Sequence, residues 1–165
     1  CLDAINFSKK PVTISHANPN FFHQSIRNID DEVLKQLVSK NGFIGLSLYP
    51  YHLKNHGNCK LEDFCEMINQ LVNMIGQDNV GIGSDLCMNW PDSVVMWMRN
   101  GKWTKKIDYG ESKDKNASWP EPVSWYSKPE DISDFLSGMI LNGVHEKTAH
   151  KIVGSNWLNF MKNHF

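Results

Sequence analysis

Residues 42–50 read GFIGLSLYP, and this stretch decides the fold class. From Phe43 to Tyr49 the chain is largely apolar on both sides of an extended backbone, and Pro50 ends the run. A strand with one wet face would alternate between apolar and polar residues, whereas a strand buried on both faces is typical of a parallel sheet covered by helices. We therefore predict a buried parallel strand over residues 43–49.

Helices and further strands are predicted on either side of this strand. Before it, a short strand at 12–14 is followed by a helix that starts at 29–32 and that Asn41-Gly42 closes with a left-handed residue. After it, a helix at 61–75 ends at Gly76, and a strand follows at 80–85. This alternation with short connections predicts an α/β fold with about three parallel strands.

The remaining segments are predicted to be mainly helical. A weak amphipathic pattern indicates a helix end at 2–9, and a helix is expected at 92–100. Helices at 129–143, 145–153 and 155–163 form a helical carboxyl-terminal tail. Residues 89–128 hold five tryptophans and three prolines, and we interpret this long irregular segment as an insertion or lid.

Composition excludes several classes of protein. The 165 residues suit one domain, and 41% hydrophobic with 21% charged residues is ordinary for a globular chain. A net charge of −1 predicts neither nucleic-acid binding nor attraction to a membrane surface. No signal peptide or membrane-spanning stretch is recognisable. The four cysteines form no CxxC pair, so we expect free thiols, with Cys87 buried beside its strand, and a cytoplasmic protein.

Polar residues follow the predicted strands where functional groups usually collect. His16 and Asp85 follow the first and third strands, residues 49–52 end the second, and Arg27 lies between His16 and the second strand. In parallel α/β sheets, substrates and cofactors bind at the carboxyl ends of strands. Histidine nitrogen and carboxylate oxygen are ligands of zinc in hydrolases. The other histidines that we considered are expected at the surface: His23, His56, His145, His150 and His164.

Two other sites can be considered from the residues alone. The glycines of VGIGSD (80–85) resemble part of a phosphate-binding loop, but the third glycine is absent and Asp85 would repel phosphate. The tryptophans of 89–128 could form a platform for an aromatic or sugar ligand, although most tryptophans in irregular segments anchor them to a core. We therefore favour a site at the strand ends.

Four stretches together resemble a known family. They are PVTISHANP (11–19), RNIDDEVLKQLVSKNGFIGLSLYP (27–50), VGIGSD (80–85) and VGSNWLNF (153–160). In this order and spacing they are similar to the carboxyl-terminal half of the membrane (renal) dipeptidase family, zinc hydrolases of the amidohydrolase superfamily.

The resemblance implies a fold and an activity. Residues 1–165 would be a single partial domain, the carboxyl-terminal part of a (β/α)8 TIM-type barrel, and the missing amino-terminal half would be its partner. The family is a zinc-dependent metallopeptidase in which two zinc ions hold a hydroxide that attacks a dipeptide amide. Carried across, His16 is a metal ligand, Arg27 binds the substrate carboxylate, and Asp85 is catalytic and contacts the substrate.

The sequence also departs from the family. The metal ligands that the family carries upstream are absent, so the 165 residues alone are expected to be inactive. The usual Asp-Phe-Asp-Gly after the last strand reads Asp85-Leu86-Cys87-Met88 here. An alternative is therefore a catalytically inactive barrel relative that binds an aromatic or sugar ligand through the Trp-rich segment. The resemblance leaves the oligomeric state open, and a homodimer is one expectation.

Overall fold

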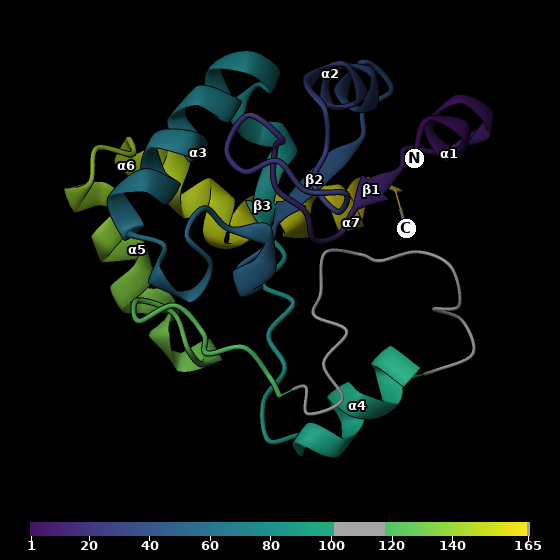
Figure 1. Ribbon diagram of the computed structural model, residues 1–165. Coiled ribbons are helices and arrows are strands. Elements are labelled where there is room, and N and C mark those ends of the chain that lie inside the picture. Colours follow the sequence, from purple (N-terminus) through teal and green to yellow (C-terminus); the bar gives the residue numbers. More distant parts are fainter. Residues whose placement is uncertain (101–117, 165) are drawn as a thin grey trace.

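The computed structural model describes residues 1–100 and 118–164. Within them, three parallel strands form a sheet in the order β1-β2-β3, which confirms the predicted α/β class (Figure 1). The strands are β1 (Thr13–Ile14), β2 (Phe43–Leu46) and β3 (Val80–Ile82). The helices are α1 (Leu2–Phe7), α2 (Asp31–Ser39), α3 (Leu61–Ile75), α4 (Asp92–Asn100), α5 (Ile132–Leu141), α6 (Glu146–His150) and α7 (Asn156–His164).

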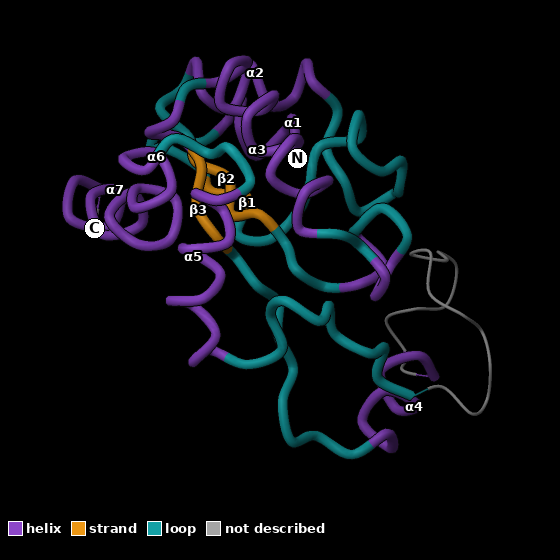
Figure 2. The backbone as a smooth tube through the Cα atoms, turned by 90° about the vertical axis from the view of Figure 1, so that its left-hand side faces the viewer, coloured by secondary structure: helices purple, strands orange, loops and turns teal. Residues whose placement is uncertain are grey.

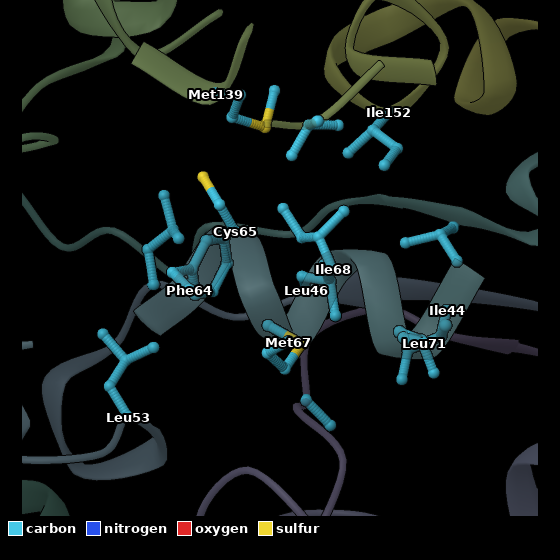
Figure 3. Close-up of a cluster of buried hydrophobic side chains, with 14 of the residues drawn as sticks. Ile44, Leu46, Leu53, Phe64, Cys65, Met67, Ile68, Leu71, Met139 and Ile152 are labelled. Atoms are coloured by element: carbon cyan, nitrogen blue, oxygen red, sulfur yellow. The ribbon is translucent and has the colours of Figure 1, made fainter. Parts of the chain in front are cut away.

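Strand β2 lies in the middle of the sheet and is buried along its whole length. Successive residues of a strand face opposite sides, so β2 contributes side chains to the packing on both faces of the sheet. Ile44 and Leu46 join a buried core with Phe64, Ile68 and Leu71 of α3 and Met139 of α5 (Figure 3). On the other side, the rings of Phe43 and Trp157 of α7 are 4.5 Å apart. The doubly apolar sequence of β2 thus reflects burial on both faces.

The helices begin and end close to the predicted positions. Helix α3 buries one apolar stripe and ends at Ile75, directly before Gly76, whose φ of 86° suits glycine. After α2, Asn41 adopts the left-handed conformation with φ of 57°, as predicted for the Asn41-Gly42 pair. Local periodicity and cap residues therefore predicted these helices well.

The strands are shorter than predicted. Strand β2 ends at Leu46 rather than Tyr49, and β3 ends at Ile82 rather than at residue 85. Beyond those points, hydrogen bonds continue irregularly: Gly83 N–H donates to the Leu46 carbonyl, and Leu48 N–H donates to the Ser84 carbonyl. Apolar sequence indicates burial, but a regular ladder also needs a partner in register.

The carboxyl-terminal tail is helical, as predicted, but its division differs. The prediction of helices at 145–153 and 155–163 placed a break near residue 154. Instead, α6 continues through a π-helical turn (Lys151–Ser155) into α7. The side chain of Asn156 donates to the carbonyls of Gln77 (2.6 Å) and Val80 (2.8 Å), which ties this tail to β3.

Helix α4 confirms the prediction at 92–100 and lies apart from the sheet in both views (Figures 1 and 2). Residues 101–117 of the predicted Trp-rich insertion, which include Trp103, lie outside the described residues. Among the described helices, none combines the length and the apolar character that crossing a bilayer requires. All four cysteines are free; Cys59 and Cys65 are buried, whereas Cys87, which we expected to be buried, is exposed.

Candidate active site

The end of β1 crosses directly over the other two strands. A Cβ atom at Gly45 or Gly83 would overlap the carbonyl oxygen of Ser15, so only glycine allows this approach. Ala17 N–H then donates to the Gly45 carbonyl at 3.0 Å. The glycines of VGIGSD thus have a packing role, and the crossing brings the segment with His16 to the carboxyl ends of β2 and β3.

His16 is held between two polar neighbours. Its Nδ1 lies 2.8 Å from Ser15 Oγ, and its Nε2 lies 3.4 Å from Arg27 Nη2. A guanidinium can only donate hydrogen bonds, so the nitrogen facing it must carry the lone pair. In the neutral ring the proton therefore lies on Nδ1, and a metal ion bound to the Nε2 lone pair would replace the contact with Arg27.

Asp85 lies at the third strand end, near the same two groups. Its backbone is left-handed, with φ of 53°, and its side chain is half-buried. Burial raises the pKa of the Asp85 carboxyl, and electrostatic attraction to the protonated form of His16 and to Arg27 opposes that rise. The structure therefore brings together the three residues that we singled out in the sequence; their chemical roles stay predictions.

A buried polar cluster lies behind these residues. It consists of Asn18, Asn28, Ser47 and His52, each at most 6% exposed. Ser47 Oγ lies 2.8 Å from His52 Nδ1. Burial is the main cause that lowers the pKa of His52 to about 4, and the charges of Arg27 and His16 add to it. His52 is therefore neutral at physiological pH.

Sequence reasoning did not find this cluster as a unit. Asparagine and serine are common in loops, and the sequence offers no periodic signal that distinguishes buried from exposed ones. The prediction that His23 lies at the surface was also wrong in part. Its ring is half-buried against His56, with ring centroids 5.7 Å apart, and burial followed by the His56 charge lowers the pKa of His23.

The described tryptophans have different environments. Trp125 Nε1 donates to the Cys59 carbonyl at 2.8 Å, and its ring stacks on Phe135, so it anchors its segment to the core. Trp90 and Trp97 are each 62% exposed. The expectation that tryptophans anchor irregular segments is confirmed for Trp125.

The described residues fit a metal ion only in part. His16 presents a suitable nitrogen, but no group of three or more His, Cys, Asp or Glu side chains in residues 1–100 and 118–164 could hold a metal. A hydrolytic zinc site usually takes three protein ligands. Any metal centre that includes His16 therefore needs ligands from outside the described part of the chain.

Parallel strands covered by helices, with a histidine, an arginine and a carboxylate at their carboxyl ends, define an α/β protein with a polar site at the sheet edge. The sequence profile of the family "Membrane dipeptidase (Peptidase family M19)" matches residues 1–93, more than half of the chain. The chain therefore belongs to the membrane dipeptidase family, as its sequence motifs suggested.

Curated relatives include fungal dipeptidases. The chain is 30% identical over 163 residues to dipeptidase ataJ of Aspergillus terreus, covering 97% of this chain and 32% of that protein. It is 33% identical over 86 residues to dipeptidase aclJ of Aspergillus oryzae, covering 48% of this chain and 19% of that protein. The chain thus spans about a third or less of the length of these relatives.

Solved structures share the fold. An amidohydrolase from Pseudomonas aeruginosa superposes with a TM-score of 0.82 at 24% identity, covering 97% of this chain and 47% of that one. A metallo peptidase from Rhodobacter sphaeroides superposes with a TM-score of 0.71 at 18% identity, covering 99% of this chain and 39% of that one. At these identities the likeness establishes the fold alone.

Proposed function

We propose that this chain is part of a zinc-dependent dipeptidase and supplies the substrate-carboxylate site, one metal ligand and an acid-base group. The observation that carries the proposal is the contact of Arg27 with His16 at the strand ends, beside Asp85. Membership of the membrane dipeptidase family supports the same reaction class. The proposal covers the whole protein, of which this chain is a portion.

Arg27 would bind the free carboxylate of the dipeptide. A guanidinium presents two parallel N–H donors that match the two oxygens of a carboxylate, and such paired bonds fix orientation as well as position. With the carboxylate held there, the scissile amide would lie toward His16 and Asp85. These contacts involve the carboxylate and the amide of the substrate, which define a dipeptide.

Asp85 would move the proton of the reaction. A carboxylate beside the amide can accept a proton from the attacking water and pass it to the nitrogen of the leaving amine. His16 would hold a zinc ion through Nε2, and a zinc ion at that position would supply Lewis-acid chemistry that polarises the amide carbonyl and makes water more acidic.

The other metal ligands would come from the rest of a (β/α)8 barrel. Strands β1 and β3 are the outer strands of the described sheet, and parallel sheets with such edges usually continue or close. The chain also corresponds to less than half of the solved amidohydrolase and metallo peptidase chains. Both observations support the proposal that residues 1–165 complete a barrel together with further sequence.

The test compares two substrates in the full-length protein that contains this chain. Ala-Ala is a suitable dipeptide because the Rhodobacter metallo peptidase was crystallised with a phosphinate mimic of L-Ala-D-Ala. Arg27→Ala should raise KM for Ala-Ala by about 10- to 100-fold, since it removes charge-assisted hydrogen bonds. KM for the carboxyl-terminal amide of Ala-Ala, which lacks the negative charge, should rise far less.

The matched control is Lys35→Ala, which removes a positive charge from the exposed face of α2. It should leave both substrates unaffected. If KM for Ala-Ala and KM for its amide rise equally in Arg27→Ala, the carboxylate-binding role is ruled out.

A second candidate function is binding of an aromatic or sugar ligand without turnover. The exposure of Trp90 favours it, because a flat exposed ring offers a stacking surface. It predicts saturable changes of tryptophan fluorescence on titration with such ligands, lost in Trp90→Ala, and no dipeptide hydrolysis. Turnover of Ala-Ala by the full-length protein would decide against it.

A further inference from the structure

The buried polar cluster (Asn18, Asn28, Ser47 and His52) lies directly behind Arg27. Asn28 is the next residue in the chain after Arg27 and is 6% exposed, whereas the Arg27 side chain is exposed. Asn18 is two residues after His16 and is fully buried. Two of the three residues with proposed roles, His16 and Arg27, thus lie within two positions of a buried asparagine.

Hydrogen bonds of the two asparagines join three segments of the chain. Asn28 Oδ1 accepts from Asn18 N–H at 3.0 Å, which links the segment of His16 to that of Arg27. Asn28 Nδ2 donates to the carbonyls of His23 (2.7 Å) and His52 (3.1 Å). Asn18 Nδ2 donates to the carbonyls of Ser47 (2.9 Å) and His52 (3.1 Å), so the segment after β2 is included.

The loop that carries Arg27 is closed at its base by the backbone. Ile29 N–H donates to the Asn18 carbonyl at 2.9 Å, and Asn20 N–H donates to the Ile29 carbonyl at 2.8 Å. Pro19 and Ile29 form a parallel bridge. Between these points the chain has no strand or helix among residues 20–28, so the side chain of Asn28 is a main constraint on the backbone next to Arg27.

We infer that Asn28 is a positioning residue, which holds Arg27 where the carboxylate of a dipeptide binds. The cluster has no direct contact with the substrate in this scheme; it acts through the backbone of Arg27. The inference rests on the proposed function, since it concerns the same carboxylate. A guanidinium that is displaced by about 1 Å loses its paired geometry, and such displacements cost large factors in rate.

The experiment uses Asn28→Asp in the full-length protein. Aspartate keeps the acceptor for Asn18 N–H but places a carboxylate oxygen against the carbonyls of His23 and His52, which repel it. The ratio of kcat/KM for Ala-Ala to kcat/KM for its amide should fall about tenfold, because only the acid depends on Arg27. In an Arg27→Ala background the same exchange should leave that ratio unchanged.

The matched control is Asn69→Asp, which also breaks an asparagine-to-carbonyl bond, to Gly143, and adds the same charge outside the cluster. It should not change the ratio. Equal falls of kcat/KM for Ala-Ala and for its amide in Asn28→Asp would overturn the positioning role. A further fall of the ratio in the Arg27→Ala background would overturn it as well.

Circular dichroism establishes whether Asn28→Asp folds. If it does not, Ser47→Ala is the second variant, since it removes only a hydroxyl, which lies 2.8 Å from His52 Nδ1 and accepts from Tyr49 N–H at 3.2 Å. It should lower the ratio about threefold, and an unchanged ratio would overturn the inference. If the wild-type protein hydrolyses neither substrate, the proposed function itself is rejected. If the protein is active but the ratio of kcat/KM for Ala-Ala to kcat/KM for its amide does not change in these variants, only the positioning role is rejected.

Discussion

Asp85 has a left-handed backbone conformation, which is unfavourable for residues other than glycine. Its φ of 53° lies in the left-handed region, where a residue other than glycine costs on the order of 1 kcal/mol. Strained positions of this kind cluster at functional sites. The conformation occurs three residues after the end of β3, where Asp85 lies near His16 and Arg27. Asp85 was predicted as a site residue because it follows a strand in the sequence. Its backbone strain is visible only in the structure.

If Asp85 moves the proton, Asp85→Asn should lower kcat for Ala-Ala by about a hundred- to ten-thousand-fold, since an amide cannot exchange a proton in this way. KM should change little. Steady-state kinetics of the full-length protein measures this, with Asp134→Asn on the exposed side of α5 as control. A kcat within a factor of about three of wild type would remove the acid-base role of Asp85.

His52 should make the protein sensitive to acid. Its pKa is lowered from 6.5 to about 4 in the folded state, so the unfolded chain binds a proton that the folded protein excludes. Above pH 6.5 His52 is neutral in both states and does not reduce the stability. As the pH falls from 6.5 to 4, protonation of the unfolded chain lowers the free energy of unfolding, by about 3 kcal/mol for a shift of this size.

Chemical denaturation of the full-length protein between pH 7 and pH 4 measures this effect. His52→Asn, which offers Ser47 a hydrogen-bond partner but cannot take up a proton, should flatten the decline. The exposed His150→Asn is the control for stability. The same pH dependence in His52→Asn and wild type would contradict the prediction.

The three strand ends meet because two glycines lie beneath Ser15. Gly45 on β2 and Gly83 after β3 both leave room for the Ser15 carbonyl. The residues of β2 and β3 are predictable from apolar runs, but the close approach is not, because a glycine in a strand is compatible with several local structures. The regular parts of the helices were predicted well because cap residues and periodicity act within a few residues of each other.

Gly83→Ala should destabilise the full-length protein by about 3 kcal/mol, because the added methyl group overlaps backbone that cannot move as a flexible side chain could. It should also impair hydrolysis, since the Ser15 segment carries His16. Urea denaturation measures the free energy of unfolding.

Gly154→Ala is the control for this exchange. Gly154 has no atom within 4 Å of the added Cβ, so its replacement should be neutral or slightly stabilising. Equal stability of the Gly83 and Gly154 variants would show that Ser15 does not need the space at Gly83.

The described part of the molecule lacks a complete metal centre, although one of its residues suits a metal. This is consistent with a chain that corresponds to less than half of the solved structures sharing its fold. Metal binding is therefore a property to be sought in the whole protein.

Dialysis of the full-length protein against a chelator should abolish hydrolysis of Ala-Ala, and added zinc should restore it. His16→Ala should lower the zinc content per chain, measured by atomic emission spectroscopy independently of activity. The exposed His145→Ala should keep the wild-type content. Activity that is indifferent to chelation would contradict a metallopeptidase, and an unchanged zinc content in His16→Ala would exclude His16 as a ligand.

The order of helices and strands, the parallel sheet and the candidates His16, Arg27 and Asp85 could be predicted from the sequence, because periodicity, caps and strand ends are local patterns. The contact of Arg27 with His16 and the burial of Asn18, Asn28, Ser47 and His52 in one cluster became evident from the folded chain. These contacts join residues up to 34 positions apart, as between Asn18 and His52. Packing of the whole chain decides which distant polar groups meet, and no local pattern records it.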